Sequence, residues 1–305
     1  RRHTRYWRDW SSDVCSSDLY IAWYDKVAKN YFCWNGTDIK NISEKIRLPL
    51  FNEENDVPEE PGNYGVMGWH ENDSLLYVYD KFDVWAIDPA GKELPYLFNI
   101  SGRESKLTIR YVSVDPEEKF FTDAQRFYFR TFSNKTKASA IRYQLRNSNV
   151  QAPVQVTPIG NYQVGNPVKA KQADLVLYTR ETFEENPDLY LSSPVTELKL
   201  SSINPQQSNY TWGSSELFNW KAYNGKEATG VIYKPENFDP KKKYPMIVYF
   251  YEKLSQDLYD YKEPAPIRSA VNIPFFVSRG YIVFTPDIEY KTGYPGQGAY
   301  DYIVS

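Results

Sequence analysis

Serine hydrolases place their nucleophile on a tight turn flanked by glycines, with a histidine and a carboxylate within reach of its hydroxyl. None of the 15 glycines of this chain begins a Gly-x-Ser-x-Gly sequence. The nearest match, GSSEL at Gly213, lacks the second glycine and precedes a hairpin strand rather than a helix. Of the two histidines, His3 and His70, only His70 lies outside the atypical N-terminal segment. The chain therefore carries no complete Ser-His-Asp machinery.

Other reactive groups are as sparse. Cys33 is the single cysteine once Cys15 is set aside with the N-terminal segment, and we expect it to be a small buried hydrophobe on a strand. One cysteine and one histidine exclude a thiolate or histidine-rich metal site, so we predict no metal and no cofactor. The run GYPGQG at Gly293–Gly298 follows a strand, but its glycine order is not that of a phosphate loop. We expect a mobile loop there instead.

The first nineteen residues, Arg1–Leu19, have an unusual composition. They contain no apolar core of a signal peptide, and their three aspartates argue against a transit peptide. A reverse translation of the segment resembles a widely used short-read sequencing adapter. We therefore interpret residues 1–19 as a non-native, adapter-derived segment and expect the native chain to begin within a gene.

Composition narrows the class of protein. The 305 residues carry a formal net charge of −3 at pH 7, which gives no electrostatic footprint for nucleic acid. No run of about 18 apolar residues exists, so we predict no membrane span. The length is sufficient for one large domain or two ordinary ones.

Residues 20–200 read as short strands joined by turns. Asn35-Gly36 is a strong hairpin signal, a polar turn at Glu71–Ser74 separates two apolar strands, and a further turn lies at Asp88–Gly91. No stretch shows the sustained helical period, and about four strands recur every 40 to 50 residues. This pattern predicts blades of a β-propeller, with a β-sandwich as the alternative.

Residues 201–305 change character. A hairpin is predicted around Asn224-Gly225, followed by an apolar strand over Pro245–Tyr251. A helix interrupted at Pro274 and closed by Gly280 should precede a second apolar strand, Tyr281–Asp287. A strand, helix and strand with apolar residues on both strand faces predict a parallel, buried sheet that ends at this last strand.

These segments, in this order, resemble the prolyl oligopeptidase family of serine peptidases, and bacterial dipeptidyl-peptidase-like members in particular. The resemblance covers most of residues 20–305 and is sharpest over Phe183–Asp287. It is carried by GWHENDSLLYVYDKFDVWAIDP, FEENPDLYL, NGKEATGVIYKPENFDPKKKYPMIVYFY and FFVSRGYIVFTPDI. The fold it implies is a partial β-propeller of C-terminal blades over residues 20–200, followed by the N-terminal part of an α/β-hydrolase catalytic domain over residues 201–305.

The resemblance also implies an activity. The parent would be a serine exo- or oligopeptidase that cleaves short peptides, with its Ser, Asp and His beyond Ser305. It implies a periplasmic location, and it would allow a homodimer of the full-length enzyme. Two alternatives stay open, a propeller that serves as a binding module and an α/β-hydrolase that acts as an esterase.

One catalytic residue is implied within the chain. In the family, a tyrosine at the end of the strand after Lys-Tyr-Pro donates its hydroxyl to the oxyanion, and Tyr251 stands at that position. The alternative is a strand tyrosine that only packs. The chain continues with Glu252-Lys253-Leu254 where dipeptidyl-peptidase relatives have Gly-Pro-like residues. Glu184 and Glu185 are similar to the paired glutamates that bind a substrate N-terminus in those enzymes, but a solvated turn is favoured.

Overall fold

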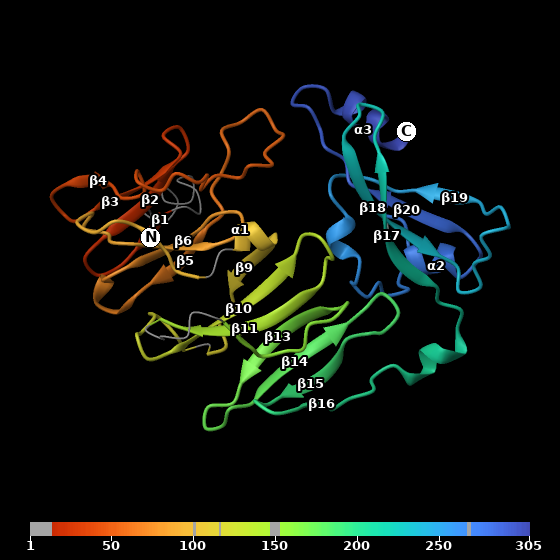
Figure 1. The fold of residues 1–305 in the computed structure, drawn as a ribbon, viewed down its shortest axis with the longest axis horizontal. Coiled ribbons are helices and arrows are strands. Elements are labelled where there is room, and N and C mark those ends of the chain that lie inside the picture. The colour runs from red at the N-terminus through yellow and green to blue at the C-terminus, as the bar shows by residue number, and fades with distance from the viewer. Residues whose placement is uncertain (1–13, 100–101, 116, 147–152, 267–269) are drawn as a thin grey trace, which may run out of the picture. The chain divides into compact units, whose positions relative to one another are not determined.

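The computed structural model describes residues 14–99, 102–115, 117–146, 153–266 and 270–305 (Figure 1). Residues 1–13 of the segment interpreted as adapter-derived thus lie outside the described residues. Residues 14–16 of the same segment form an edge strand. The chain divides into two compact units, of which the second comprises Val156–Ser305 with two short earlier segments.

The first unit is built from three four-stranded sheets whose strands follow chain order, as expected of propeller blades. Their strands are β1 (Val14–Ser16), β2 (Ile21–Asp25), β3 (Asn30–Trp34), β4 (Ile39–Asn41), then β5 (Val66–Trp69), β6 (Leu76–Tyr79), β7 (Val84–Ile87), β8 (Tyr96–Leu97), then β9 (Leu107–Tyr111), β10 (Arg126–Ser133), β11 (Ser139–Leu145) and β12 (Val154–Gln155). Within the described residues, none of these sheets closes on itself.

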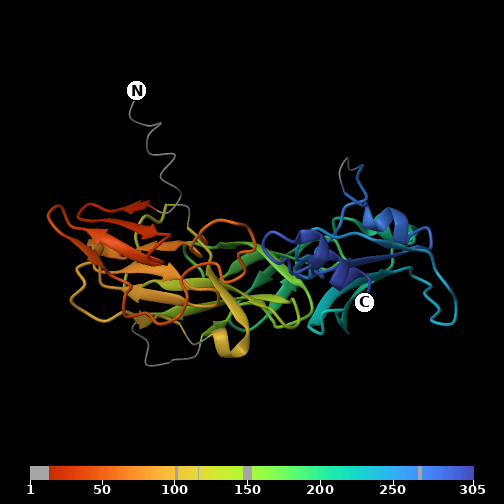
Figure 2. The ribbon, with the colours of Figure 1, turned by 90° about the horizontal axis from the view of Figure 1, so that it is seen from above.

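Consecutive sheets of this unit pack face to face. All four residues of β6 are buried, and the alternation of side chains along a strand divides them between two faces. Leu76 and Val78 join the core shared with the first sheet, whereas Tyr77 and Tyr79 join the core shared with the third. Figure 2 shows the first sheet, in red, layered on the second, in orange. Apolar residues on both strand faces are therefore needed to stack the sheets.

The turns lie at the positions that the sequence predicts. Gly36 and Gly225 both have positive φ, 93° and 84°, in the turns that the two Asn-Gly pairs predict. The amide of Gly91 donates to the carbonyl of Asp88 over 3.0 Å, which closes the expected Asp88–Gly91 turn. A short 3₁₀ helix, Glu71–Asp73, occupies the polar turn between β5 and β6.

The second unit contains two sheets of different kinds. The fourth sheet is again antiparallel in chain order, and the fifth has the order β17-β18-β20-β19. Their strands are β13 (Gln163–Lys169), β14 (Val176–Glu181), β15 (Asp188–Ser192), β16 (Glu197–Lys199), then β17 (Ser214–Lys221), β18 (Glu227–Lys234), β19 (Met246–Val248) and β20 (Ile282–Pro286). Helices α1 (Gly102–Ser105), α2 (Ile273–Val277) and α3 (Pro295–Ile303) complete the described elements, with short 3₁₀ turns.

The fifth sheet is mixed, and it contains both the hairpin and the parallel strand pair that the sequence predicts. β19 and β20 are parallel, with α2 in the connection between them, but β18 runs antiparallel to both β17 and β20. β20 therefore lies inside the sheet, and β19 is the edge that the sequence pattern assigned to β20. An apolar strand is suited to burial, but its sequence does not show which neighbour it pairs with or in which direction.

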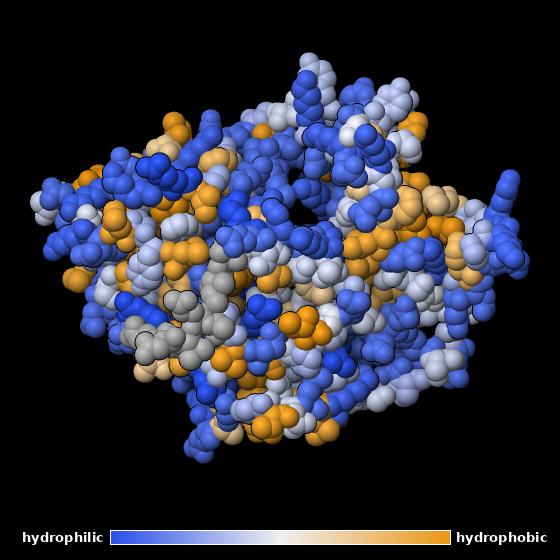
Figure 3. Space-filling view, in the orientation of Figure 1, coloured by the Kyte–Doolittle hydropathy of each residue, from blue (hydrophilic) through white to orange (hydrophobic). Residues whose placement is uncertain are grey.

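The two faces of the fifth sheet are covered unequally. Val231, Tyr233 and Val283 pack against α2 and are almost fully buried. On the opposite face Phe218 is 42 % exposed and Met246 is 51 % exposed, and Val248 and Phe250 are exposed as well. Figure 3 shows hydrophobic surface gathered over this sheet. We call Phe218, Met246, Val248 and Phe250 the bare face.

Helix α2 is shorter than the sequence predicts, and Pro274 does not interrupt it. Asn272 caps its N-terminus by accepting a hydrogen bond from the amide of Phe275 over 2.9 Å. Pro274 stands in the first turn, where a missing N–H costs nothing. Gly280 has φ 83° and ends the turn beyond the helix, as expected.

Candidate functional site

Tyr251 lies just beyond β19, at the edge of the fifth sheet where two parallel strands end. Val248 of β19 stands opposite Phe284 of β20, so both strands deliver their following loops to the same edge. Functional groups of open α/β sheets gather at such carboxyl ends. The residues to consider are therefore 249–255 after β19 and 287–290 after β20, which lie in the blue part of Figure 1.

Backbone hydrogen bonds continue the pairing of the two strands beyond their ends. The amide of Tyr249 donates to the carbonyl of Phe284 over 2.9 Å. The amide of Ile288 donates to the carbonyl of Glu252, also over 2.9 Å. Tyr251 thus sits between two points at which its segment is tied to the segment after β20.

A carboxylate fixes the far end of the same segment. Oδ1 of Asp287 accepts hydrogen bonds from the amides of Leu254 and Ser255 at 2.7 and 2.8 Å. Oδ2 accepts from the hydroxyl of Ser255 at 2.5 Å, and Ser255 is 1 % exposed. Charge-assisted bonds of this kind are stronger than bonds between neutral groups. The chain after Tyr251 is therefore held by Asp287 as it enters a 3₁₀ turn.

Tyr290 holds the peptide of Tyr251 itself. Its hydroxyl donates to the carbonyl oxygen of Tyr251. Burial raises the pKa of Tyr290, and the negative charge of Glu252 adds to the increase, so the phenol keeps its proton and stays a donor at neutral pH.

The side chain of Tyr251 is presented to solvent. It is 70 % exposed, and within the described residues no group hydrogen-bonds to its hydroxyl. A phenol in this state can donate a hydrogen bond to an anionic oxygen brought to the sheet edge. The arrangement can thus stabilise negative charge, and it contains no nucleophile of its own.

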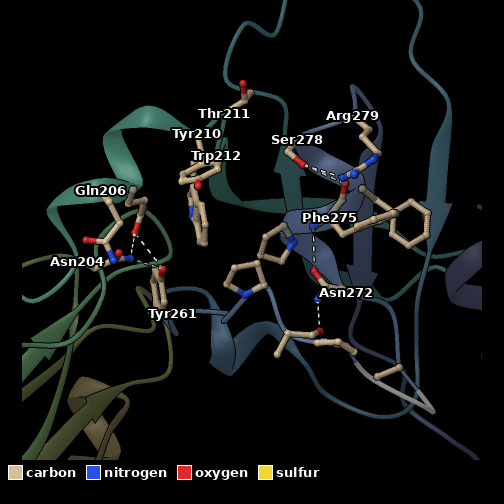
Figure 4. A pocket seen from close by; sticks show the side chains of 17 residues that line it. Asn204, Gln206, Tyr210, Thr211, Trp212, Tyr261, Asn272, Phe275, Ser278 and Arg279 are labelled. Atoms are coloured by element: carbon tan, nitrogen blue, oxygen red, sulfur yellow. Dashed lines mark hydrogen bonds between the residues drawn. The ribbon is translucent and has the colours of Figure 1, made fainter.

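A cavity of about 810 Å³ lies elsewhere in the second unit, between the segment before β17 and helix α2 (Figure 4). The rings of Trp212 and Tyr261 stack there with centroids 5.2 Å apart and planes 3° apart. Trp212 Nε1 donates to the carbonyl of Phe183 at 2.7 Å. The Tyr261 hydroxyl accepts from Asn204 at 3.2 Å and donates to Gln207 at 3.0 Å.

The opposite wall of this cavity comes from α2. The Arg279 guanidinium lies 3.7 Å from the ring centroid of Phe275 and donates to the Phe275 carbonyl. A largely apolar cavity of this size can hold a small ligand. Its named polar groups already bond to one another or to backbone, so the cavity adds no reactive group.

The other residues singled out from the sequence lie away from Tyr251. His70 is buried in the first unit, where Nδ1 lies 2.9 Å from Ser74 Oγ and Nε2 lies 3.2 Å from Asp123 Oδ1. Arg146 contacts both His70 Nε2 and Asp123, so this carboxylate is already paired. His70 therefore belongs to a core polar cluster.

Cys33 is the buried strand residue that the sequence predicts. It is 2 % exposed in β3 and unbonded to another cysteine. Desolvation by burial raises the pKa of its thiol to about 12, and the negative charge of Asp88 adds to the increase. The thiol is thus protonated and unreactive at neutral pH.

Glu184 and Glu185 form a solvated turn, as favoured from the sequence. The amides of both donate to Thr182 Oγ1, at 3.1 and 3.0 Å. Burial and the charge of Glu185 raise the pKa of Glu184. Nothing in this turn aims the two carboxylates at a common point.

The glycine-rich run at Gly293–Gly298 is not the expected loop, because helix α3 begins at Pro295. Proline is well suited to the first helical position. A Cβ on Gly298 would lie 2.9 Å from the carbonyl oxygen of Glu289, so the helix packs too closely for any larger residue. Tertiary contact here outweighs the low helix propensity of glycine.

Asp287, Tyr290 and Ser255 were not identified from the sequence. An acid directly after an apolar strand, as in TPD, is a usable signal for a group at a strand end. The pairing of Asp287 with Ser255 required the strand order. Within the described residues, no cluster of three metal-ligating side chains occurs and no helix is long and apolar enough to cross a membrane.

Two solved structures show the same fold. Dipeptidyl peptidase 4 of Porphyromonas gingivalis matches with a TM-score of 0.59 and 13 % identity, over 90 % of this chain and 37 % of its own. A post-proline cleaving enzyme from Rickettsia typhi matches with a TM-score of 0.51 and 13 % identity, over 96 % of this chain and 40 % of its own. No family model and no curated protein matches the sequence.

The likeness establishes the fold. The mostly β-sheet chain resembles part of both matched structures, and it spans less than half the length of either.

Proposed function

We propose that this chain is part of a serine peptidase of the prolyl oligopeptidase family and that Tyr251 is its oxyanion donor. One observation carries the proposal. Tyr251 stands at the carboxyl end of β19, beside its parallel neighbour β20, with its backbone tied down and its hydroxyl exposed. The names of the two matched structures, a dipeptidyl peptidase and a post-proline cleaving enzyme, support peptides as the substrate class.

The fold assignment within this proposal has two parts. We interpret the four antiparallel sheets up to Lys199 as blades of a partial propeller and the fifth sheet as the start of an α/β-hydrolase domain. The mixed order β17-β18-β20-β19 and the connection through α2 support the second part. The elbow serine, the acid and the histidine would then come from outside this chain, which alone should hydrolyse neither amides nor esters.

The mechanism assigned to Tyr251 is electrostatic. When a nucleophile adds to a carbonyl, its oxygen gains negative charge, and a phenol already positioned can donate to it. The donor stabilises charge that exists only in the transition state, so it raises kcat more than it lowers KM. Removal of one such donor costs about 10²–10³ in kcat.

The test is steady-state kinetics in the complete enzyme with Tyr251→Phe. We expect kcat on a chromogenic dipeptide amide to fall about 10²–10³-fold, with KM nearly unchanged. Tyr249→Phe is the matched control, because it removes a hydroxyl from the neighbouring tyrosine of the same segment, and it should leave kcat within about twofold. Equal kcat values for the wild type and Tyr251→Phe would exclude Tyr251 from the site. A dipeptide ester, assayed alongside, separates a peptidase from an esterase.

A further inference from the structure

The side chain of Tyr251 has little packing to hold it in place. At 70 % exposure, its ring cannot be oriented by neighbouring side chains in the way that a buried tyrosine is. An oxyanion donor nevertheless has to be preorganised to within a fraction of an ångström. Its orientation must therefore come from the backbone that carries it, and from the groups that hold that backbone.

Those groups come from the segment after β20. Tyr290 donates to the carbonyl of Tyr251, which fixes the peptide plane on the C-terminal side of that residue. Ile288 donates to the next carbonyl, that of Glu252, over 2.9 Å. Two successive carbonyls of the Tyr251 segment are thus held by residues two positions apart on its neighbour.

Asp287 holds the end of the same segment by three hydrogen bonds. The amides of Leu254 and Ser255 and the hydroxyl of Ser255 use both oxygens of this carboxylate. Ser255 is buried at 1 % exposure, so these bonds are shielded from competing water. Loss of the carboxylate would leave a buried hydroxyl and two amides in need of partners.

Helix α3 supports this segment from behind. Gly298 is so close to it that a Cβ would lie 2.9 Å from the carbonyl oxygen of Glu289 and 3.2 Å from Cα of Tyr290. Ile288 of this segment and Tyr302 of α3 belong to the same buried cluster. Lys226 pairs with Glu289 at 3.0 Å on the outer side. The segment that holds Tyr251 is therefore itself held on more than one side.

We propose that Asp287 and Tyr290 are positioning residues that set the orientation of Tyr251 for catalysis. The catalytic part of this inference rests on the proposed function, whereas the positioning of the segment does not. If these residues had a purely structural role, their substitution would lower the stability of the fold and nothing else. A positioning role predicts local loosening of residues 249–255 and a loss of kcat that depends on the Tyr251 hydroxyl.

The first test measures hydrogen exchange of peptides covering residues 249–258 in the 305-residue chain at low concentration. Asp287→Ala should speed exchange of the Leu254 and Ser255 amides about 10–100-fold, since hydrogen bonds to a charged group contribute that much to protection. Asp287→Asn keeps an acceptor for both amides and should restore most of the protection. Asp301→Asn, a matched control in α3 whose carboxylate accepts from Gln297, should leave these peptides unchanged.

Circular dichroism separates local loosening from unfolding. If Asp287→Ala fails to fold, Tyr290→Phe decides, because it removes only one hydroxyl and should speed exchange around Glu252 at least threefold while far-UV signal and Tm are kept. If Asp287→Ala folds and its exchange over residues 249–258 is unchanged, the positioning role is overturned. If Asp287→Ala does not fold, unchanged exchange in Tyr290→Phe overturns it.

The second test is a double-mutant cycle in the complete enzyme. Asp287→Ala alone should lower kcat at least tenfold with KM within about twofold, and Asp287→Asn should recover most of that loss. In the Tyr251→Phe background, Asp287→Ala should change kcat by less than about twofold, because there is no hydroxyl left to position. Additive losses overturn the inference. If Tyr251→Phe has no effect by itself, the proposed function fails, and hydrogen exchange still decides whether the segment is held.

Discussion

The second and fifth sheets look alike in sequence but are buried in different ways. In the second sheet, every residue of β6 is buried, because a sheet packs on each face. In the fifth, β19 has two exposed residues out of three, and α2 covers one face of the sheet whereas the bare face is exposed. Both strands are apolar throughout. Apolar residues on both faces of a strand therefore indicate an environment that suits burial, and they do not identify what covers each face.

The largest expected effect is a difference in the free energy of unfolding between a variant of the second sheet and a variant of the fifth. Tyr77 of β6 is fully buried, and the centroid of its ring lies 4.9 Å from that of Phe98 and 6.0 Å from that of Phe127. Tyr77→Ala should lower the free energy of unfolding by about 3–5 kcal/mol. Phe218→Ala, on the bare face, should cost about 1 kcal/mol or less. Urea unfolding of both variants measures the difference, and similar losses would show that the two sheets are equally buried.

The second effect concerns self-association. An apolar face and an unpaired edge on the same sheet favour contact between copies, so we expect the 305-residue chain to associate. Phe218→Lys combined with Met246→Lys should move the mass in light scattering toward the 35.7 kDa monomer, with Tm unchanged within about 2 °C. Val27→Lys, which changes an exposed turn residue of the first unit, is the control and should have no effect. A monodisperse wild-type monomer contradicts this expectation.

The third effect is a pH dependence of opposite sign in the two regions. Burial raises the pKa of Asp83, beside the second sheet, above its ordinary value of 3.8, although hydrogen bonds from Gly102 and Asn99 act against the shift. Near the fifth sheet, burial is the largest single influence on Glu289 and acts to raise its pKa, but the hydrogen bond and the positive charge of Lys226, together with smaller contributions, lower the pKa below 4.5.

The sign of each pH dependence follows from the linkage between proton binding and folding. Folded Asp83 binds its proton more tightly than the unfolded chain, so its contribution to stability falls as pH rises through the window above 3.8. Folded Glu289 binds its proton less tightly, so its contribution is lost as pH falls through the window below 4.5. In a plot of unfolding free energy against pH from 3 to 6, Asp83→Asn should therefore make the slope more positive, and Glu289→Gln should make it less positive. A slope change of the same sign for both variants contradicts the assignment.

Local features were predictable from the sequence, and contacts between distant segments were not. The Asn-Gly turns, the buried Cys33 and the Glu184–Glu185 turn follow from neighbouring residues, and the structure has each as expected. The direction of β18, the helix at Pro295 and the capping of Ser255 by Asp287 depend on which strands pair. These features could not be read from spacing alone, because strand order is decided by packing of the whole sheet. Tyr251 was named through a family resemblance, and its catalytic role stays a prediction.

The smallest expected effect concerns the first sheet, whose edge strand β1 comes from the segment interpreted as adapter-derived. β1 is three residues long, and among the described strands it pairs with β2 alone; the amide of Leu19 donates to Asp73 at 3.0 Å. Short terminal edge strands fray with free energies close to zero. Deletion of residues 1–19 should therefore change the free energy of unfolding by about 1 kcal/mol or less, and deletion of residues 1–13, which spares β1, should change it still less. Thermal melting of the two truncated chains beside the full one measures this. A loss of several degrees in Tm on deletion of 1–19, absent on deletion of 1–13, would mean that β1 is a required strand of the first sheet, and the interpretation of residues 14–19 as foreign would then lose its support.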